Sequence, residues 1–158
     1  MASLNKITIH WTAGTNYPNS TDKQHYHYLV NKEGKIIEGK YKPEDNLNCK
    51  DGKYAAHTGG GNTGNIGIAV CGMLDSRYPI NRKQIEACCK KVAELSKKYG
   101  ISISSKNILT HAEFGNTHPN TTSYGKIDIN KLPCVAIYGV DAVGTWLRNK
   151  INWYRSRL

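Results

Sequence analysis

The first predicted strand carries a histidine on its polar face and is anchored in the core by its apolar face. Strict alternation of apolar and polar residues over about Lys6 to Thr12 predicts a β-strand. Its apolar residues share one face, and the opposite, polar face carries Thr8, His10 and Thr12. A strand anchored in the core is a rigid support, so we expect the His10 imidazole to be held in a fixed direction.

Further strands are predicted from apolar and β-branched runs. A hairpin covers Tyr26 to Glu38 and turns at residues 32–35, and a short strand covers about Asn107 to Thr110. A polar, glycine-rich loop follows at Thr58 to Gly64. The next run, Asn65 to Cys71, is small and β-branched, which is typical of a strand buried on both faces.

The start of this hairpin contains a tyrosine between two histidines. If the strand begins at Tyr26, alternation puts His25 and His27 on the face opposite the tyrosine. Only one side of this run can then face a functional site.

Two longer segments follow the helical period. In Asn81 to Tyr99, apolar residues recur every three or four positions, Asn81 can cap the start and Gly100 can end the helix. A second helix is predicted at roughly Asp141 to Tyr154, with one apolar stripe that would cover the sheet. We therefore predict an α/β fold with a mixed central β-sheet flanked by helices, in a single domain over residues 1–158.

Composition narrows the class of partner. A chain of 158 residues lies in the usual range of one domain and can bury a proper core. Its formal net charge of +10 attracts polyanions, but Lys and Arg are dispersed along the chain. Because no helix-turn-helix, zinc-finger or aromatic-platform pattern occurs, we predict no specific binding of nucleic acid.

Neither the N-terminus nor the cysteines indicate an exported or membrane protein. No long apolar run suits a membrane span and no charged-then-apolar start suits a signal peptide, so we expect synthesis in the cytoplasm without membrane insertion. The five cysteines form an odd set without a C-x-x-C pair, which is typical of reduced packing residues. Cys134 alone stays open as a neighbour of a metal.

Three separated segments end in residues that bind metals, namely His10, His111 and Asp128. Two imidazoles and one carboxylate leave a fourth tetrahedral position open for water, which distinguishes a catalytic zinc from a closed structural one. Glu113 and His118 compete with Asp128 as the third ligand. Glu113 is two residues from His111, and His118 precedes a proline in a polar loop. These residue types point to hydrolysis and leave the third ligand open.

The order of several motifs resembles a known family. The segments are Thr8-Ile9-His10-Trp11-Thr12-Ala13-Gly14, Tyr26-His27-Tyr28-Leu29-Val30, His57-Thr58-Gly59, Asn65-Ile66-Gly67-Ile68-Ala69, Thr110-His111-Ala112-Glu113 and Gly125-Lys126-Ile127-Asp128. In this order they resemble the type 2 N-acetylmuramoyl-L-alanine amidases, which include phage lysozymes with amidase activity and the peptidoglycan recognition proteins. The resemblance covers roughly residues 5 to 150, and the ordered set is more specific than any one motif.

The resemblance implies a role for each candidate residue. Asp128 becomes the third zinc ligand, because the family pattern places a ligand there. Lys126 lies two residues earlier, so in an extended segment its ammonium points to the same side and can stabilise an oxyanion. Tyr26 matches a tyrosine beside the zinc in similar amidases and can donate a hydrogen bond. His57 and Asn62, at the glycine-rich loop, are expected to bind substrate.

The predicted reaction is zinc-dependent hydrolysis of the amide bond between the lactyl group of N-acetylmuramic acid and L-alanine in peptidoglycan. Zinc would lower the pKa of water from about 15.7 toward 7 and polarise the lactyl carbonyl. Anionic cell-wall polymers are expected as further partners, because they suit the positive charge. We expect a monomeric amidase domain, a phage or prophage endolysin that acts on the wall after release.

Two other functional classes fit the sequence less well than a zinc amidase. A non-catalytic peptidoglycan-binding module is the alternative, and the complete set of candidate ligands favours catalysis over it. A zinc peptidase acting on protein is expected to carry a His-Glu-x-x-His helix, and the sequence has none.

Overall fold

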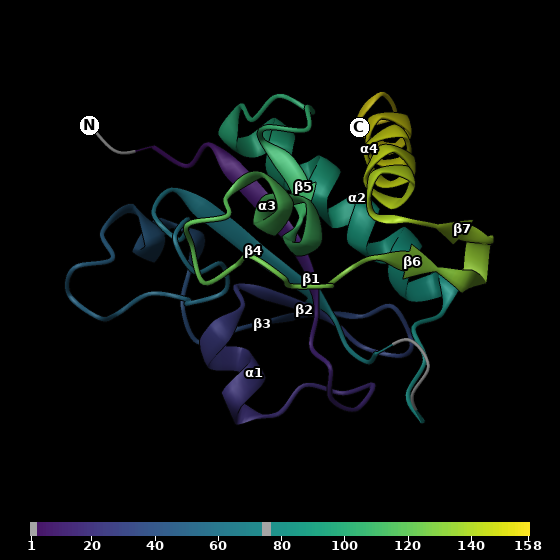
Figure 1. Cartoon of the computed structure of the whole chain (residues 1–158), viewed down its shortest axis with the longest axis horizontal. Coiled ribbons are helices and arrows are strands. Elements are labelled where there is room, and N and C mark those ends of the chain that lie inside the picture. The colour runs from purple at the N-terminus through teal and green to yellow at the C-terminus, as the bar shows by residue number, and fades with distance from the viewer. Residues whose placement is uncertain (1–2, 74–76) are drawn as a thin grey trace.

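A five-stranded sheet forms the centre of the computed structural model, which describes residues 3–73 and 77–158 (Figure 1). The strands are Lys6–Trp11 (β1), Tyr28–Val30 (β2), Ile36–Glu38 (β3), Asn65–Val70 (β4) and Ile108–Thr110 (β5). Their order is β3-β2-β4-β1-β5, with β3 antiparallel to β2 and all other neighbours parallel. The mixed sheet predicted from the sequence is confirmed.

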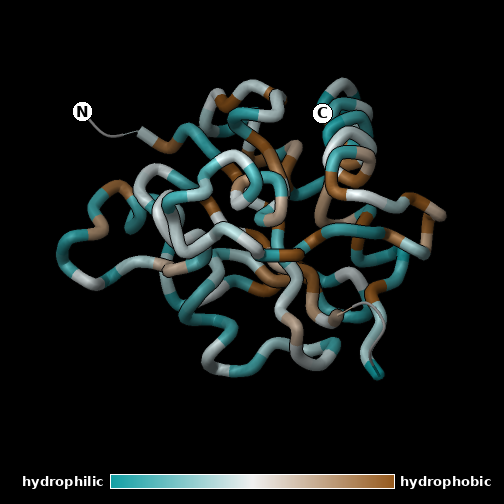
Figure 2. Tube along the Cα trace, in the orientation of Figure 1, coloured by the Kyte–Doolittle hydropathy of each residue, from teal (hydrophilic) through white to brown (hydrophobic). Residues whose placement is uncertain are grey.

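The central strands are buried on both faces, as parallel strands usually are. All six residues of β4 are buried. In β1, Thr8 and His10 have no exposed surface although they lie on its polar face. Thr8 donates a hydrogen bond to Asn65 Oδ1 at 3.0 Å, so burial leaves its hydroxyl paired. The polar face of β1 is therefore covered by other parts of the chain, and Figure 2 shows both strands at the centre of the molecule.

Two long helices cover the other face of the sheet. They are Arg82–Tyr99 (α2) and Val140–Arg155 (α4), close to the predicted bounds. Asn81 caps α2 by accepting a hydrogen bond from the Gln84 N–H, and Gly100 ends it with a left-handed φ of 66°. Buried side chains of both helices join one core cluster with Ile7 and Ile9 of β1.

Two short helices lie on the groove side of the sheet and were not predicted. They are Ser20–His25 (α1) and His111–Thr117 (α3). Each starts with a capping box, Asn19 with Asp22 and Thr110 with Glu113, in which side chains bond the free backbone N–H groups. The expectation that a strand begins at Tyr26 is wrong, because α1 continues to His25 and β2 starts at Tyr28.

The remaining elements are small. Lys131–Leu132 (β6) and Ile137–Tyr138 (β7) form a two-stranded sheet, and Pro43–Leu47 (η1) and Pro133–Val135 (η2) are 3₁₀ helices. All five cysteines are free. Within the described ranges, no helix has both the length and the apolar character that crossing a membrane requires.

Candidate functional site

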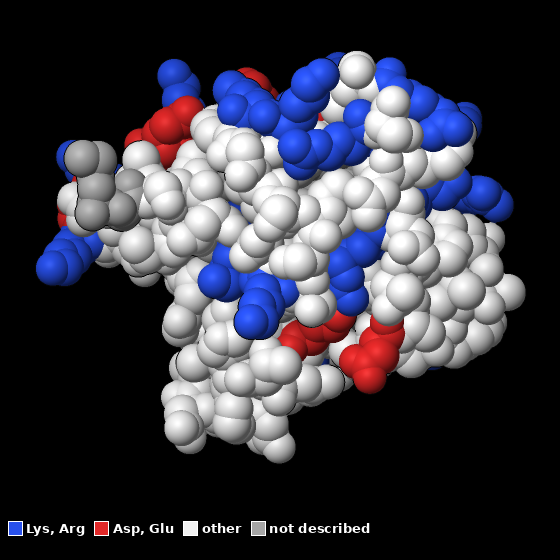
Figure 3. Space-filling view, turned by 90° about the horizontal axis from the view of Figure 1, so that it is seen from above, with Lys and Arg blue, Asp and Glu red and all other residues white. Residues whose placement is uncertain are grey.

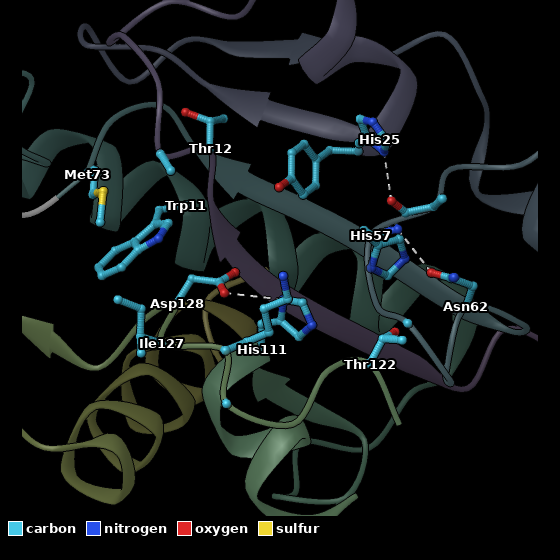
Figure 4. Close-up of a pocket in the computed structure, with 16 residues that line it drawn as sticks. Trp11, Thr12, His25, His57, Asn62, Met73, His111, Thr122, Ile127 and Asp128 are labelled. Carbon is cyan, nitrogen blue, oxygen red and sulfur yellow. Dashed lines mark hydrogen bonds and ion pairs between the residues drawn. The ribbon is translucent and has the colours of Figure 1, made fainter. Parts of the chain in front are cut away.

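A groove of about 680 Å³ opens at the carboxyl ends of β1 and β5, the edge where parallel sheets commonly bind ligands. Segments far apart in the sequence form its walls: the end of β1, the end of α1, the loop after Ala56 and the stretch from Thr122 to Asp128. Figure 4 shows its two ends. One end carries His25, His57, Asn62 and Thr122, and the other carries Trp11, Met73 and Ile127.

The three candidate ligands meet at the base of this groove, where His111 and Asp128 line it and the fully buried His10 lies beneath them. His10 Nδ1 lies 3.0 Å from one carboxylate oxygen of Asp128, and His111 Nδ1 lies 3.3 Å from the other. In the described part of the chain, they are the one group of histidine, cysteine and acidic residues close enough to hold a metal ion, with ligand atoms within 4.8 Å of one another.

The second ring nitrogen of His10 is fixed by a hydrogen-bond chain. His57 Nε2 lies 2.9 Å from the Asn65 carbonyl oxygen, which can only accept, so His57 carries its proton on Nε2. Its bare Nδ1 then accepts a hydrogen bond from His10 Nε2 at 3.1 Å. The proton of neutral His10 is thereby placed on Nε2, and the lone pair of Nδ1 faces Asp128.

A second chain fixes His111 in the same way. The Ser123 hydroxyl donates to the Gly59 carbonyl oxygen at 2.6 Å. Ser123 Oγ therefore accepts from His111 Nε2, which lies 3.0 Å away. The lone pair of His111 Nδ1 also faces Asp128, so two imidazole lone pairs and one carboxylate converge on one point.

This arrangement fits a divalent metal ion. Lone pairs facing a carboxylate repel one another unless a cation lies between them, and hydrogen bonds from the far nitrogens are the usual supports of metal-binding histidines. The separations of 3.0 and 3.3 Å resemble the distance of about 3.3 Å between ligand atoms of a tetrahedral zinc at its usual bond lengths.

Burial and hydrogen bonding set the charges of these groups. Burial lowers the pKa of His10 to about 4, although the negative charge of Asp128 opposes the shift, so its imidazole is neutral at pH 7. Burial alone would raise the pKa of Asp128, but the adjoining His10 and His111 rings outweigh this effect and lower the value to about 2. Neutral imidazoles and an ionised carboxylate are the forms that bind metals.

Lys126 and Tyr26 both line the groove near these ligands. Lys126 is exposed, and its charge is among the causes that lower the pKa of His10. The segment from Lys126 to Asp128 lies outside the strands, and both side chains line the groove. The Tyr26 ring lies 5.1 Å from the His10 ring, and burial raises the pKa of its phenol. Its hydroxyl therefore stays protonated and can donate a hydrogen bond.

His57 and Asn62 also line the groove, but much of their hydrogen-bonding capacity is used internally. Both ring nitrogens of His57 face other residues, and Gly67 leaves room for this ring because a Cβ there would collide with it. Asn62 Oδ1 accepts from the backbone N–H groups of His57 and Thr58 and so shapes the loop. The Asn62 side-chain NH₂ has no hydrogen-bond partner among the described residues.

His25 lies in the groove, contrary to the expectation from strand alternation. It is the last residue of α1, and its Nδ1 lies 2.9 Å from the Ala56 carbonyl oxygen. Helical rather than extended backbone therefore turns His25 to the same side as Tyr26. His27 is buried beneath the groove, where Nε2 donates to Asn46 Oδ1 and Nδ1 accepts from the Gly67 N–H.

The competing ligand candidates have other partners. Glu113 caps α3 and forms a buried two-bond ion pair with Arg148 of α4, with both N–O distances at 2.9 Å. His118 stacks on Phe114 with ring centroids 3.9 Å apart. Cys134 belongs to η2 and packs against the core cluster. None of the three lines the groove.

Comparisons with solved structures identify the fold. N-acetylmuramoyl-L-alanine amidase LysC from Clostridium intestinale URNW aligns with a TM-score of 0.52 and 21% identity, over 70% of this chain and 71% of its own. Drosophila peptidoglycan recognition protein SD aligns with a TM-score of 0.52 and 20% identity, over 77% and 76%. The endolysin amidase LysCS from the same Clostridium aligns with a TM-score of 0.50 and 21% identity, over 70% and 73%.

Sequence comparison assigns the family. No curated protein matches the chain. The family model described as N-acetylmuramoyl-L-alanine amidase matches residues 1–126, most of the chain, and this range includes His10 and His111 but ends two residues before Asp128. The chain therefore belongs to the N-acetylmuramoyl-L-alanine amidase family.

Proposed function

We propose that this protein hydrolyses the amide bond between the lactyl group of N-acetylmuramic acid and L-alanine in bacterial peptidoglycan, and that it depends on zinc. The observation that carries the proposal is the convergence of His10 Nδ1, His111 Nδ1 and Asp128 at the base of the groove. Family membership supports the choice of bond. Two imidazoles and one carboxylate are a donor set of catalytic zinc sites and leave a coordination position open.

The protein side chains around the metal have separate tasks in this proposal. A zinc ion bound there supplies a Lewis acid for the carbonyl and lowers the pKa of the attacking water. The ammonium of Lys126 stabilises the negative charge that develops on the carbonyl oxygen. The phenol of Tyr26 donates a hydrogen bond to the same region, because its raised pKa keeps the proton on oxygen.

The two ends of the groove suit different parts of the substrate. Muramic acid presents hydroxyl and N-acetyl groups, so the end with Asn62 and Thr122 provides hydrogen-bonding partners for the sugar (Figure 4). The alanine methyl group and the peptide beyond it suit the apolar end, where Trp11 and the half-exposed Ile127 lie. Substrate bound in this direction presents its amide bond to the ligands between the two ends.

A protein of similar fold indicates a biological setting for this reaction. One protein of similar fold is described as an endolysin, and we propose the same role here. In this role residues 1–158 act as one catalytic domain that reaches the cell wall after release from the cell. The fold is shared with peptidoglycan recognition protein SD, so a module that binds peptidoglycan without cutting it is the alternative.

The decisive experiment is digestion of purified peptidoglycan followed by mass analysis of the new ends. The proposal predicts peptides with a new L-alanine amino terminus. The glycan chains should stay intact, and each cleaved muramic acid should carry a free lactyl carboxylate. The Asp128→Ala protein serves as the matched inactive control. Cleaved glycosidic bonds would point to a different hydrolase. Binding without any new end would leave the recognition module as the function.

A further inference from the structure

The positive charge of this protein is concentrated on its helical layer. α2 carries six Lys or Arg residues and two Glu, and the segment from α4 to the last residue carries four Lys or Arg residues and one Asp. These two segments therefore hold +7 of the formal net charge of +10. Figure 3 shows Lys and Arg side chains gathered along one edge of the molecule, while most of the opposite edge is white.

Some of these cations are already neutralised. Glu86 accepts from Arg82 at 3.4 Å and from Lys150 at 3.3 Å, and Arg148 is paired with Glu113. Lys150 also lies over two tryptophan rings of α4. These contacts fix the cations within the helical layer, so they are poorly placed to reach a ligand.

The free cations form a regular stripe along α2. Lys83, Lys90 and Lys97 are exposed, and none forms an ion pair with a described residue. They are seven residues apart, which places them on one side of the helix at intervals of about 10 Å. Glu94 is exposed on the same side, between Lys90 and Lys97, and is the one acidic residue along this stripe. The stripe presents three ammonium groups over roughly 20 Å.

The stripe and the groove lie on opposite sides of the sheet. The inner side of α2 packs in the core cluster with Ile7 and Ile9 of β1, whereas His10 on the other face of β1 contacts Asp128 in the wall of the groove. A ligand held on the outer side of α2 would therefore leave the groove open to substrate.

We propose that the Lys83, Lys90 and Lys97 stripe binds a phosphate-bearing linear polymer of the bacterial cell wall and so holds the enzyme on its substrate. The inference rests on the proposed function for the location of the partner. A single row of ammonium groups acts as separate point charges, which suits a flexible chain of phosphodiesters. On the neighbouring α4, Lys150 and Arg157 lie over the Trp153 ring and occupy a surface on which a base of single-stranded nucleic acid would stack.

Co-sedimentation tests this surface. The protein is mixed with purified walls that carry phosphodiester polymers and with the same walls after hydrofluoric acid has removed these polymers. The variant Lys83→Gln, Lys90→Gln, Lys97→Gln should bind intact walls about tenfold more weakly, since each exposed charge contact contributes modestly. Stripped walls should bind the parent protein as weakly as intact walls bind the variant.

A charge-matched control distinguishes the effect of the stripe on wall binding from the effect of net charge. Lys23, Lys50 and Lys53 are exposed and lie outside α2 and α4. The variant with Gln at all three positions loses the same charge as the stripe variant. It should retain most wall binding, while Glu94→Gln should bind more tightly than the parent protein. Equal loss in both triple variants would overturn the proposal, and so would equal binding to stripped walls.

A competition assay and a hydrolysis assay test the choice of ligand and the independence of the groove. Soluble poly(glycerol phosphate) should compete with the walls for binding of the protein. Single-stranded DNA at equal phosphate concentration should compete less. Stronger competition by DNA would make the surface a nucleic-acid site and contradict the proposal. Hydrolysis of a small soluble muropeptide should be unchanged in the stripe variant. Because that assay reports the groove alone, a failure of the proposed amidase activity would be seen there and would not be confused with loss of wall binding.

Discussion

Polar and charged groups lie in opposite environments in the groove and on the outer side of α2. In the groove, the ligand groups are buried, and each imidazole and the carboxylate has a specific partner at 3.0 to 3.3 Å. On α2, Lys83, Lys90 and Lys97 are exposed and form no ion pair with described residues. Interactions in a buried site are strong and geometry-dependent, whereas exposed charges act through screened attraction. Single substitutions should therefore have large effects in the groove and small, additive effects on the helix.

The largest effect is expected from loss of the metal. Purified protein should contain about one zinc per chain, and a chelator should abolish amidase activity until zinc is returned. Asp128→Ala should lose the metal as well, because two histidines alone bind zinc more weakly than the full ligand set. Wall binding through α2 should survive both treatments. Metal analysis by mass spectrometry decides the point, and activity that is indifferent to chelation would rule out a zinc enzyme.

Lys126 should show the next largest effect. Lys126→Ala is expected to keep its fold and its zinc but to lose roughly 10²–10³ in turnover, the scale of removing one oxyanion donor. Steady-state kinetics with parallel metal analysis distinguishes it from Asp128→Ala. Lys23→Ala, an exposed substitution on α1, is the matched control. Near-normal turnover in Lys126→Ala would transfer the electrophilic role to Tyr26.

Acid should destabilise the metal-free protein through its buried histidines. Burial lowers the pKa of both His10 and His27 to about 4, below the value of about 6.5 in an unfolded chain. Between these values the unfolded chain binds more protons, so stability is full above pH 6.5 and is lost as pH falls toward 4. Each histidine contributes on the order of 3 kcal/mol.

Urea unfolding of the metal-free protein from pH 7 to 4 measures this loss. His27→Gln should remove part of it, because the buried His10 and His57 remain. The α2 stripe variant should keep the full slope, since lysines do not titrate in this range. A flat profile for the parent protein would contradict the buried, neutral state of the histidines.

The hydrogen-bond chains behind the ligands predict an intermediate effect. Ser123→Ala removes the acceptor of His111 Nε2 and should weaken zinc binding about 10–100-fold, the usual result of losing such a support. Competition with a zinc chelator of known affinity provides the measurement. Thr122→Ala, in the groove but without a bond to a histidine, should keep the parent affinity. Equal affinities in all three proteins would show that the chain does not orient the ligand.

The smallest effect is expected from salt on the groove. Between about 50 and 300 mM salt, hydrolysis of a small soluble muropeptide should change less than about twofold, while binding to intact walls should weaken steeply. The difference arises because salt screens exposed charges and hardly reaches buried ones. Similar salt dependence in both assays would remove the distinction between the two faces.

Much of the scaffold could be predicted because local patterns are sufficient there. The apolar period and the two capping residues predicted α2 almost to the residue, from Asn81 to Gly100. The buried run of β4 was equally clear. In contrast, α1 and α3 are six and seven residues long and have too few turns to show a period. Their capping boxes were readable signals, and recognising Asn19 with Asp22 would have predicted a helix before Tyr26 in place of a strand.

The sequence by itself determined the chemistry available: two histidines, an aspartate, a lysine and a tyrosine in motifs that resemble an amidase family. Tertiary structure decided which of their atoms meet. His10 lies 47 residues from His57 and 118 from Asp128, and these separations carry no local signal. The charges of α2 and of α4 came together on one side of the molecule only when the two helices packed together on the sheet. Such contacts depend on the directions of side chains after packing, and residue order alone does not specify them.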